Sequence, residues 1–116
     1  MVVDELGGAE VDRIFQALAD ATRRDIIARV MRAEQSVSAL AGHYPMSFAA
    51  VQKHVAVLER AGLVAKERRG REQVVHAVLE ALRTAARLLD EYERVWRHRA
   101  DGIGAILAAD KRRKED

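Results

Sequence analysis

The hydrophobic pattern of this chain changes period at residue 63, and this change limits the fold more than any other feature of the sequence. Before it, apolar residues recur at helical spacing. Residues 63–78, "LVAKERRGREQVVHAV", then hold two runs rich in β-branched residues around Arg-Gly-Arg, which predicts a β-hairpin with a charged, glycine-containing tip. From about Leu79 the helical period returns. The chain is therefore predicted to be mainly α-helical with one small hairpin.

Two helices are predicted in the first third of the chain. The first carries apolar residues at the i, i+3, i+4, i+7 spacing of one helix face: Val11, Ile14, Phe15 and Leu18. The second is predicted to begin near Thr22, because Thr22 and Asp25 have the spacing of a capping box. Its predicted buried stripe consists of Ile26, Ile27, Val30 and Met31. Both helices therefore present an apolar face to a common core.

A short helix and a longer one follow, separated by a turn. Ser36 is placed to cap the short helix, through "SVSALAGHY", and residues 42–45 then break the pattern. Ser47 caps the longer helix, residues 47–61, which Gly62 ends. A short helix, a tight turn, a longer helix and an immediate β-hairpin form a winged helix-turn-helix. In that fold the longer helix lies in the DNA major groove.

The outer face of the helix over residues 47–61 has the chemistry of a surface that contacts DNA. At 100° per residue the large apolar side chains gather on one side: Val51, Val55 and Leu58. The opposite side carries two methyl groups, one amide and one cation: Ala49, Gln52, Lys53 and Ala56. Small residues let the backbone approach base edges, Gln pairs with adenine, and Lys reaches guanine or phosphate. An amphipathic helix with its polar side in water would show the same pattern, so the helix alone does not decide the function.

The hairpin adds a basic patch to a chain whose formal net charge is only +2. Residues 60–72 hold five bases against two acids; the bases are Arg60, Lys66, Arg68, Arg69 and Arg71. A solvated loop would also carry such charges. However, the three arginines at the tip are predicted to enter a minor groove or pair with phosphates. The basic hairpin directly after the helix favours double-stranded DNA as the partner.

Residues 79–109 are predicted to form a long C-terminal dimerisation helix. Apolar residues recur at seven-residue intervals: Leu82, Leu89, Trp96 and Ile103. A second row fills the alternate positions: Ala85, Tyr92 and Ile106. Such a stripe is longer than a small domain covers, which favours packing against a twin helix; a core helix folded back on its own domain is the alternative. Gly102 and Gly104 are expected to weaken the far end.

Two segments resemble the ArsR/SmtB transcriptional repressors: "FQALADATRRDIIARV" and "SFAAVQKHVAVLERAGLVAKERRGREQVVHAV". The resemblance runs from about residue 11 to residue 90 and implies a homodimeric winged helix-turn-helix repressor that binds inverted repeats in promoters. It also implies a recognition segment over residues 48–54 and a wing over residues 65–75. The predicted DNA contacts are Arg23, Ser47, Phe48, Ala49, Gln52, Lys53, His54, Arg68, Arg69 and Arg71. The first and last helices would form the dimer interface, through Ile14, Leu18, Leu82, Leu89, Tyr92, Trp96 and Ile103.

The chain departs from the metal-sensing members of that family. It has no cysteine, and Ser36 and Ser38 stand where those members carry the thiolates of a Cys-Val-Cys motif. Soft-metal sensing needs thiolate ligands. Other members bind zinc on the last helix, but His98 and Asp101 do not reproduce their ligand spacing. No metal and no cofactor are therefore predicted, and a small-molecule effector of unknown identity stays open.

Other function classes have weaker support. Without a cysteine nucleophile or a glycine-rich phosphate loop, the sequence does not predict an enzyme. A winged-helix module that binds another protein through the same outer face is the alternative to DNA binding. The first ten residues are acidic without an apolar run, and the uncharged apolar run over residues 102–109 is too short to span a bilayer. We therefore expect one cytoplasmic domain over residues 1–116, without a membrane partner.

Overall fold

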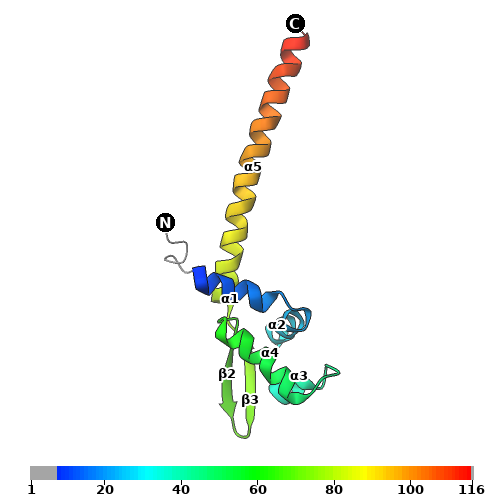
Figure 1. Ribbon diagram of the computed structural model, residues 1–116, viewed down its shortest axis with the longest axis vertical. Coiled ribbons are helices and arrows are strands. Elements are labelled where there is room, and N and C mark those ends of the chain that lie inside the picture. Colours follow the sequence, from blue (N-terminus) through cyan, green and yellow to red (C-terminus); the bar gives the residue numbers. More distant parts are fainter. Residues whose placement is uncertain (1–7, 116) are drawn as a thin grey trace. The chain divides into compact units, whose positions relative to one another are not determined.

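The structure, a computed structural model, describes residues 8–115. In chain order the elements are α1 (Gly8–Leu18), α2 (Ala21–Arg32), β1 (Gln35–Ser36), α3 (Val37–Ala41), α4 (Phe48–Arg60), β2 (Val64–Arg69), β3 (Glu72–Ala77) and α5 (Leu79–Glu115) (Figure 1). The contacts divide the chain into two units, residues 1–85 and residues 86–116. Residues 1–7, which belong to the acidic N-terminal stretch, lie outside the described residues, as does the side chain of Ile106.

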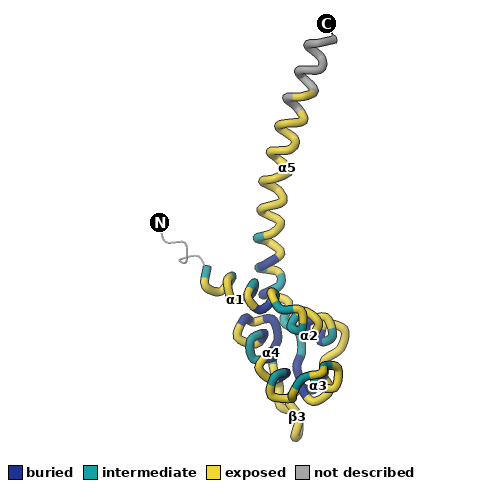
Figure 2. Tube along the Cα trace, turned by 45° about the vertical axis from the view of Figure 1, so that its right-hand side comes forward, coloured by how far each residue is buried: buried dark blue, intermediate teal, exposed yellow. Residues whose placement is uncertain are grey.

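The first unit has one hydrophobic core, to which all its helices and the hairpin contribute (Figure 2). Its largest fully buried side chains are Ile14, Ile26, Leu40, Val51, Val55, Leu58, Leu63 and Val75. Ile27 and Val30 are buried as predicted, but the prediction for Met31 is wrong, because this side chain is 52% exposed. Met31 lies 100° around α2 from Val30, beyond the apolar face. It lines a shallow surface depression together with Leu79.

The start of α2 also differs from the prediction. The helix is capped by Asp20, whose carboxylate accepts a hydrogen bond from the Arg23 amide at 3.0 Å, and not by Thr22. Asp20 has the extended backbone of an N-cap residue, and Asp25 bonds elsewhere. The two serine caps are confirmed. Ser36 and Ser47 accept hydrogen bonds from backbone amides three residues ahead, at the starts of α3 and α4.

The predicted hairpin is confirmed in register as well as position. Strands β2 and β3 pair from Val64 opposite Ala77 to Arg69 opposite Glu72, which leaves Gly70 and Arg71 as the loop. Gly70 has φ +63°, and no other described residue of this loop has a positive φ. This is the type II′ pattern, in which glycine stands first. A third strand, β1, was not predicted; it pairs antiparallel with β3 and completes the sheet order β1-β3-β2.

Helix α5 continues past the predicted end at residue 109. It runs through Gly102 and Gly104 to Glu115. Its large apolar side chains from residue 89 onward are exposed wherever side chains are described, namely Leu89, Tyr92, Val95, Trp96, Ile103 and Leu107. In the described part of the chain, no helix has both the length and the apolar character needed to span a membrane.

Candidate nucleic-acid interface

The turn between α3 and α4 is tied to α2 by a tyrosine. The Tyr44 hydroxyl donates to Asp25 Oδ2 at 2.6 Å, and Arg29 Nε donates to the same oxygen at 2.8 Å. The Arg29 guanidinium also lies 5.8 Å from the centroid of the Tyr44 ring. Burial and the bond to Asp25 raise the pKa of Tyr44 to about 12. The bonds from Tyr44 and Arg29 lower the pKa of Asp25. These contacts hold the chain in place just before the longer helix.

Helix α4 divides into a buried face and an exposed face, as the sequence predicted. Val51, Val55 and Leu58 are essentially fully buried. Ala49, Gln52 and Lys53 are exposed, together with Phe48, which is 46% exposed. Among the described residues, no hydrogen-bond or ion-pair partner is recorded for Lys53. The first two turns of α4 therefore present an amide, a free cation and small or apolar groups to the outside, and these turns contact bases in helix-turn-helix proteins.

A small notch lies beside this face, between α3, α4 and the hairpin. It has a volume of about 100 Å³ and is lined by Val37, Gln52, Val55, Lys66 and Gln73. Lys66 Nζ lies 3.5 Å from a carboxylate oxygen of Glu59. The sequence prediction did not single out Lys66 or Gln73 as site residues. The sequence feature that could have identified them is the period-two alternation of the hairpin. It places Lys66 and Arg68 on one face of β2, and Gln73 pairs opposite Arg68.

The three arginines of the hairpin tip have different surroundings. Arg69 pairs with both carboxylate oxygens of Glu34, which directly precedes β1, and its Nη2 also lies 3.0 Å from Glu67 Oε2. These carboxylates raise the pKa of Arg69, and Arg69 lowers the pKa of Glu34. Arg68 Nε donates to the Gly70 carbonyl at 3.3 Å. Arg71 is exposed, and no partner is recorded for it in the described part of the chain.

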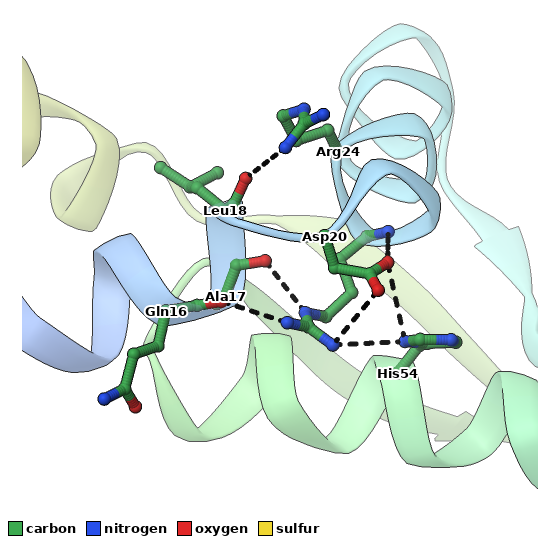
Figure 3. A network of polar contacts seen from close by, with 7 residues as sticks. Gln16, Ala17, Leu18, Asp20, Arg24 and His54 are labelled. Carbon is green, nitrogen blue, oxygen red and sulfur yellow. Dashed lines mark hydrogen bonds and ion pairs between the residues drawn. The ribbon is translucent and has the colours of Figure 1, made fainter.

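Two other predicted contact residues lie next to each other and point inward. Arg23 Nη1 is 3.4 Å from His54 Nδ1, and other nitrogens of Arg23 donate to backbone carbonyls of α1 (Figure 3). Neither side chain belongs to the exposed face of α4. Ser47 lies beside that face, but its Oγ accepts the Ala50 amide as the helix cap.

The predicted dimer residues also separate into two groups. Ile14 does not fit the predicted dimer interface. Its side chain is fully buried inside its own unit and has no surface to offer a partner. Ala85, predicted in the apolar stripe, is likewise buried in that core, while Leu18 and Leu82 are partly buried against it. The remaining predicted interface residues are exposed on α5: Leu89, Tyr92, Trp96 and Ile103. Within the described residues, no three His, Asp or Glu side chains are arranged to hold a metal ion.

Comparison with known proteins identifies transcriptional regulators among the relatives of this chain. No family model matches the chain. The HTH-type transcriptional regulator Rv2034 of Mycobacterium tuberculosis is 35% identical over 99 residues, which cover 83% of this chain and 87% of the relative. The structure of an ArsR-like transcriptional regulator from Rhodococcus sp. RHA1 is similar with a TM-score of 0.73 and 38% identity, over 84% of this chain and 92% of that one.

A third similarity concerns the fold alone. The solution structure of a homodimeric winged helix-turn-helix DNA-binding domain from Mycobacterium bovis matches with a TM-score of 0.61 and 24% identity. The match covers 78% of this chain and 84% of that domain. The predicted winged helix-turn-helix fold is therefore confirmed by the order of the elements and by these structures.

Proposed function

The chain belongs to the ArsR family of winged helix-turn-helix transcriptional regulators, and we propose that it acts as a homodimeric repressor that places α4 in the major groove of operator DNA. The observation that carries this proposal is the exposed face at the start of α4, next to the basic hairpin. Gln52 and Lys53 are exposed there beside Phe48 and Ala49, and such a face suits a partner that approaches closely.

In this proposal Gln52 recognises a base pair, because a Gln amide pairs bidentately with the N6 and N7 of adenine. Ala49 and Phe48 offer apolar contact to a thymine methyl group, and Lys53 reaches guanine or phosphate. The hairpin supplies contacts to the phosphates of the DNA backbone through Arg68 and Arg71. Ser47 places these residues by capping the helix.

The proposed dimer forms through α5. Leu89, Tyr92, Trp96 and Ile103 follow a heptad pattern and are exposed on a single helix. A second copy of α5 would remove these side chains from water, which is the usual role of such a stripe. Because a twofold dimer presents two recognition helices, the operator is expected to be an inverted repeat whose half-sites lie about one DNA turn, or a multiple, apart.

The test begins by selecting duplexes from a random pool with the purified full-length protein. Binding of a selected duplex and of a scrambled duplex is then measured by fluorescence anisotropy at several salt concentrations. The expected result is tight, salt-sensitive binding of the selected duplex by two chains, with weaker binding of the scrambled one. If neither duplex is bound at low salt, DNA recognition is refuted, and the face of α4 would belong to a protein partner.

A further inference from the structure

Arg23 connects three helices of the first unit through one guanidinium group. Its side chain begins in the first turn of α2 and is 18% exposed. Its Nε donates to the Ala17 carbonyl at 2.8 Å, and its Nη2 donates to the Gln16 carbonyl at 2.9 Å, at the end of α1. Its Nη1 lies 3.4 Å from His54 Nδ1 on α4. One side chain thus links the end of α1 to the helix that carries the proposed DNA-contacting face.

The carbonyls at the end of α1 need such donors. The last four carbonyls of a helix have no partner within it. α1 ends at Leu18, and α2 begins only three residues later, at Ala21. The planar guanidinium carries its donors in a fixed fork, so it can bind two successive carbonyls and still direct a third nitrogen elsewhere. An ammonium on a flexible stem does not have this geometry.

Asp20 also lies next to the Arg23 guanidinium and helps to orient it. Its carboxylate caps α2 at the Arg23 amide, and Oδ2 lies 3.9 Å from Arg23 Nη1. Oδ1 lies 4.0 Å from His54 Nδ1. The hydrogen bond from the Arg23 amide, supported by the charge of Arg23, lowers the pKa of Asp20. The carboxylate is therefore ionised at neutral pH and faces both partners.

His54 connects this network to the proposed DNA-contacting face of α4. His54 follows Lys53 directly and lies two residues after Gln52, so any shift of its turn moves both side chains. We propose that Arg23 is a positioning residue for DNA recognition: it fixes the first half of α4 against the end of α1 and does not itself contact phosphate. This inference rests on the proposed function, since it concerns how the same face is held.

The experiment compares Arg23→Lys and Arg23→Gln with wild type on the selected and scrambled duplexes, over a range of salt concentrations. Arg24→Lys and Arg24→Gln are the matched controls, because the Arg24 side chain is exposed and, among the described residues, donates only to the Leu18 carbonyl, at 2.7 Å. Both Arg23 variants are expected to lower the preference for the selected duplex by about tenfold or more, as expected when a bidentate base contact is lost. Their salt dependence should stay that of wild type, and the Arg24 variants should keep the preference.

Two outcomes would overturn the inference. If Arg23→Gln weakens both duplexes equally, reduces the salt slope by about 1, and is rescued by Arg23→Lys, then Arg23 contacts phosphate. If the Arg23 variants bind as wild type does, the network positions nothing. A wild-type protein that selects no duplex would instead refute the proposed function, and the inference with it.

A second pair of variants covers the case in which the Arg23 variants fail to fold. His54→Asn keeps an acceptor oxygen at the δ position, whereas His54→Leu removes the acceptor and leaves the bonds of Arg23 to α1 in place. The preference for the selected duplex should be kept by His54→Asn and lost by His54→Leu, with circular dichroism used to verify folding. Equal preference in the two variants would contradict the link between Arg23 and α4.

Discussion

Replacing Glu34 should strengthen DNA binding, although Glu34 lies outside the proposed interface. Its carboxylate holds the guanidinium of Arg69 in a bidentate pair, and Glu67 supplies a second carboxylate. Both Glu34 and Arg69 are about half exposed. In wild type this pair keeps Arg69 away from phosphate, which is why the proposed complex uses Arg68 and Arg71 instead. Glu34→Gln removes this competing charge and keeps the shape of the side chain.

The expected gain in DNA affinity follows from the release of one arginine, Arg69, from its ion pair with Glu34. One arginine that gains one phosphate steepens the slope of log K against log salt by about 0.9. Since exposed ion pairs contribute little to stability, affinity near 0.1 M salt should rise on the order of two- to fivefold. The same slope means that the advantage should shrink about 3.5-fold between 50 and 200 mM salt.

Fluorescence anisotropy on the selected duplex measures both quantities. Glu72→Gln is the matched control, because it removes the same charge at the hairpin tip from a residue that has no recorded partner among the described residues. Glu34→Gln should exceed this control, and the excess should vanish in the Arg69→Gln background. Equal gains from the two Glu variants, or a gain that persists without Arg69, would refute the reasoning.

Three further changes test the other parts of the structure. Gln52→Ala should lower discrimination at one base pair by about 1–3 kcal/mol, measured across single-base operator variants, and unchanged discrimination would contradict base recognition by Gln52. Trp96→Ala should weaken the dimer by about 2 kcal/mol or more in sedimentation equilibrium, while Arg94→Ala, on the opposite side of the heptad, should not. Tyr44→Phe should lower the free energy of urea unfolding by about 1.5 kcal/mol at pH 7. Because the folded pKa of Asp25 is lowered, this contribution is present above the unfolded pKa of about 3.9 and lost as pH falls through the folded value, so an equal loss at pH 3 would contradict it.

Much of the fold follows from the sequence, because its main signals are local. The helical spacing of Val51, Val55 and Leu58 fixes which face of α4 is buried, and Gly70 fixes the hairpin turn. Strand β1 could not be predicted in this way. It has only two residues, and two residues carry no alternation. Its existence depends on pairing with β3, which lies far along the chain.

The candidate site was predictable to a smaller extent. The exposed residues of α4 and the basic tip follow from local sequence patterns. The N-cap of α2 was predicted wrongly because Asp20 and Thr22 are both good cap residues. The dimer prediction failed at Ile14 for a related reason. A helix face of four apolar residues does not tell which of them turn toward their own core and which toward a partner, and Ile14 is fully buried.

The pairing of two arginines within the protein is the part that local sequence patterns do not show. Arg23 and Arg69 have the same formal charge as Lys53 and Arg71, and a count of bases treats all four as phosphate contacts. In the folded chain, two backbone carbonyls and a histidine on α4 bind Arg23, while Glu34 and Glu67 bind Arg69. Of these partners, His54 and Glu34 lie 31 and 35 residues away along the chain, so only the tertiary structure shows that Arg23 and Arg69 are already paired while Lys53 and Arg71 are exposed. In the proposed complex, the number of basic residues therefore exceeds the number of phosphate contacts.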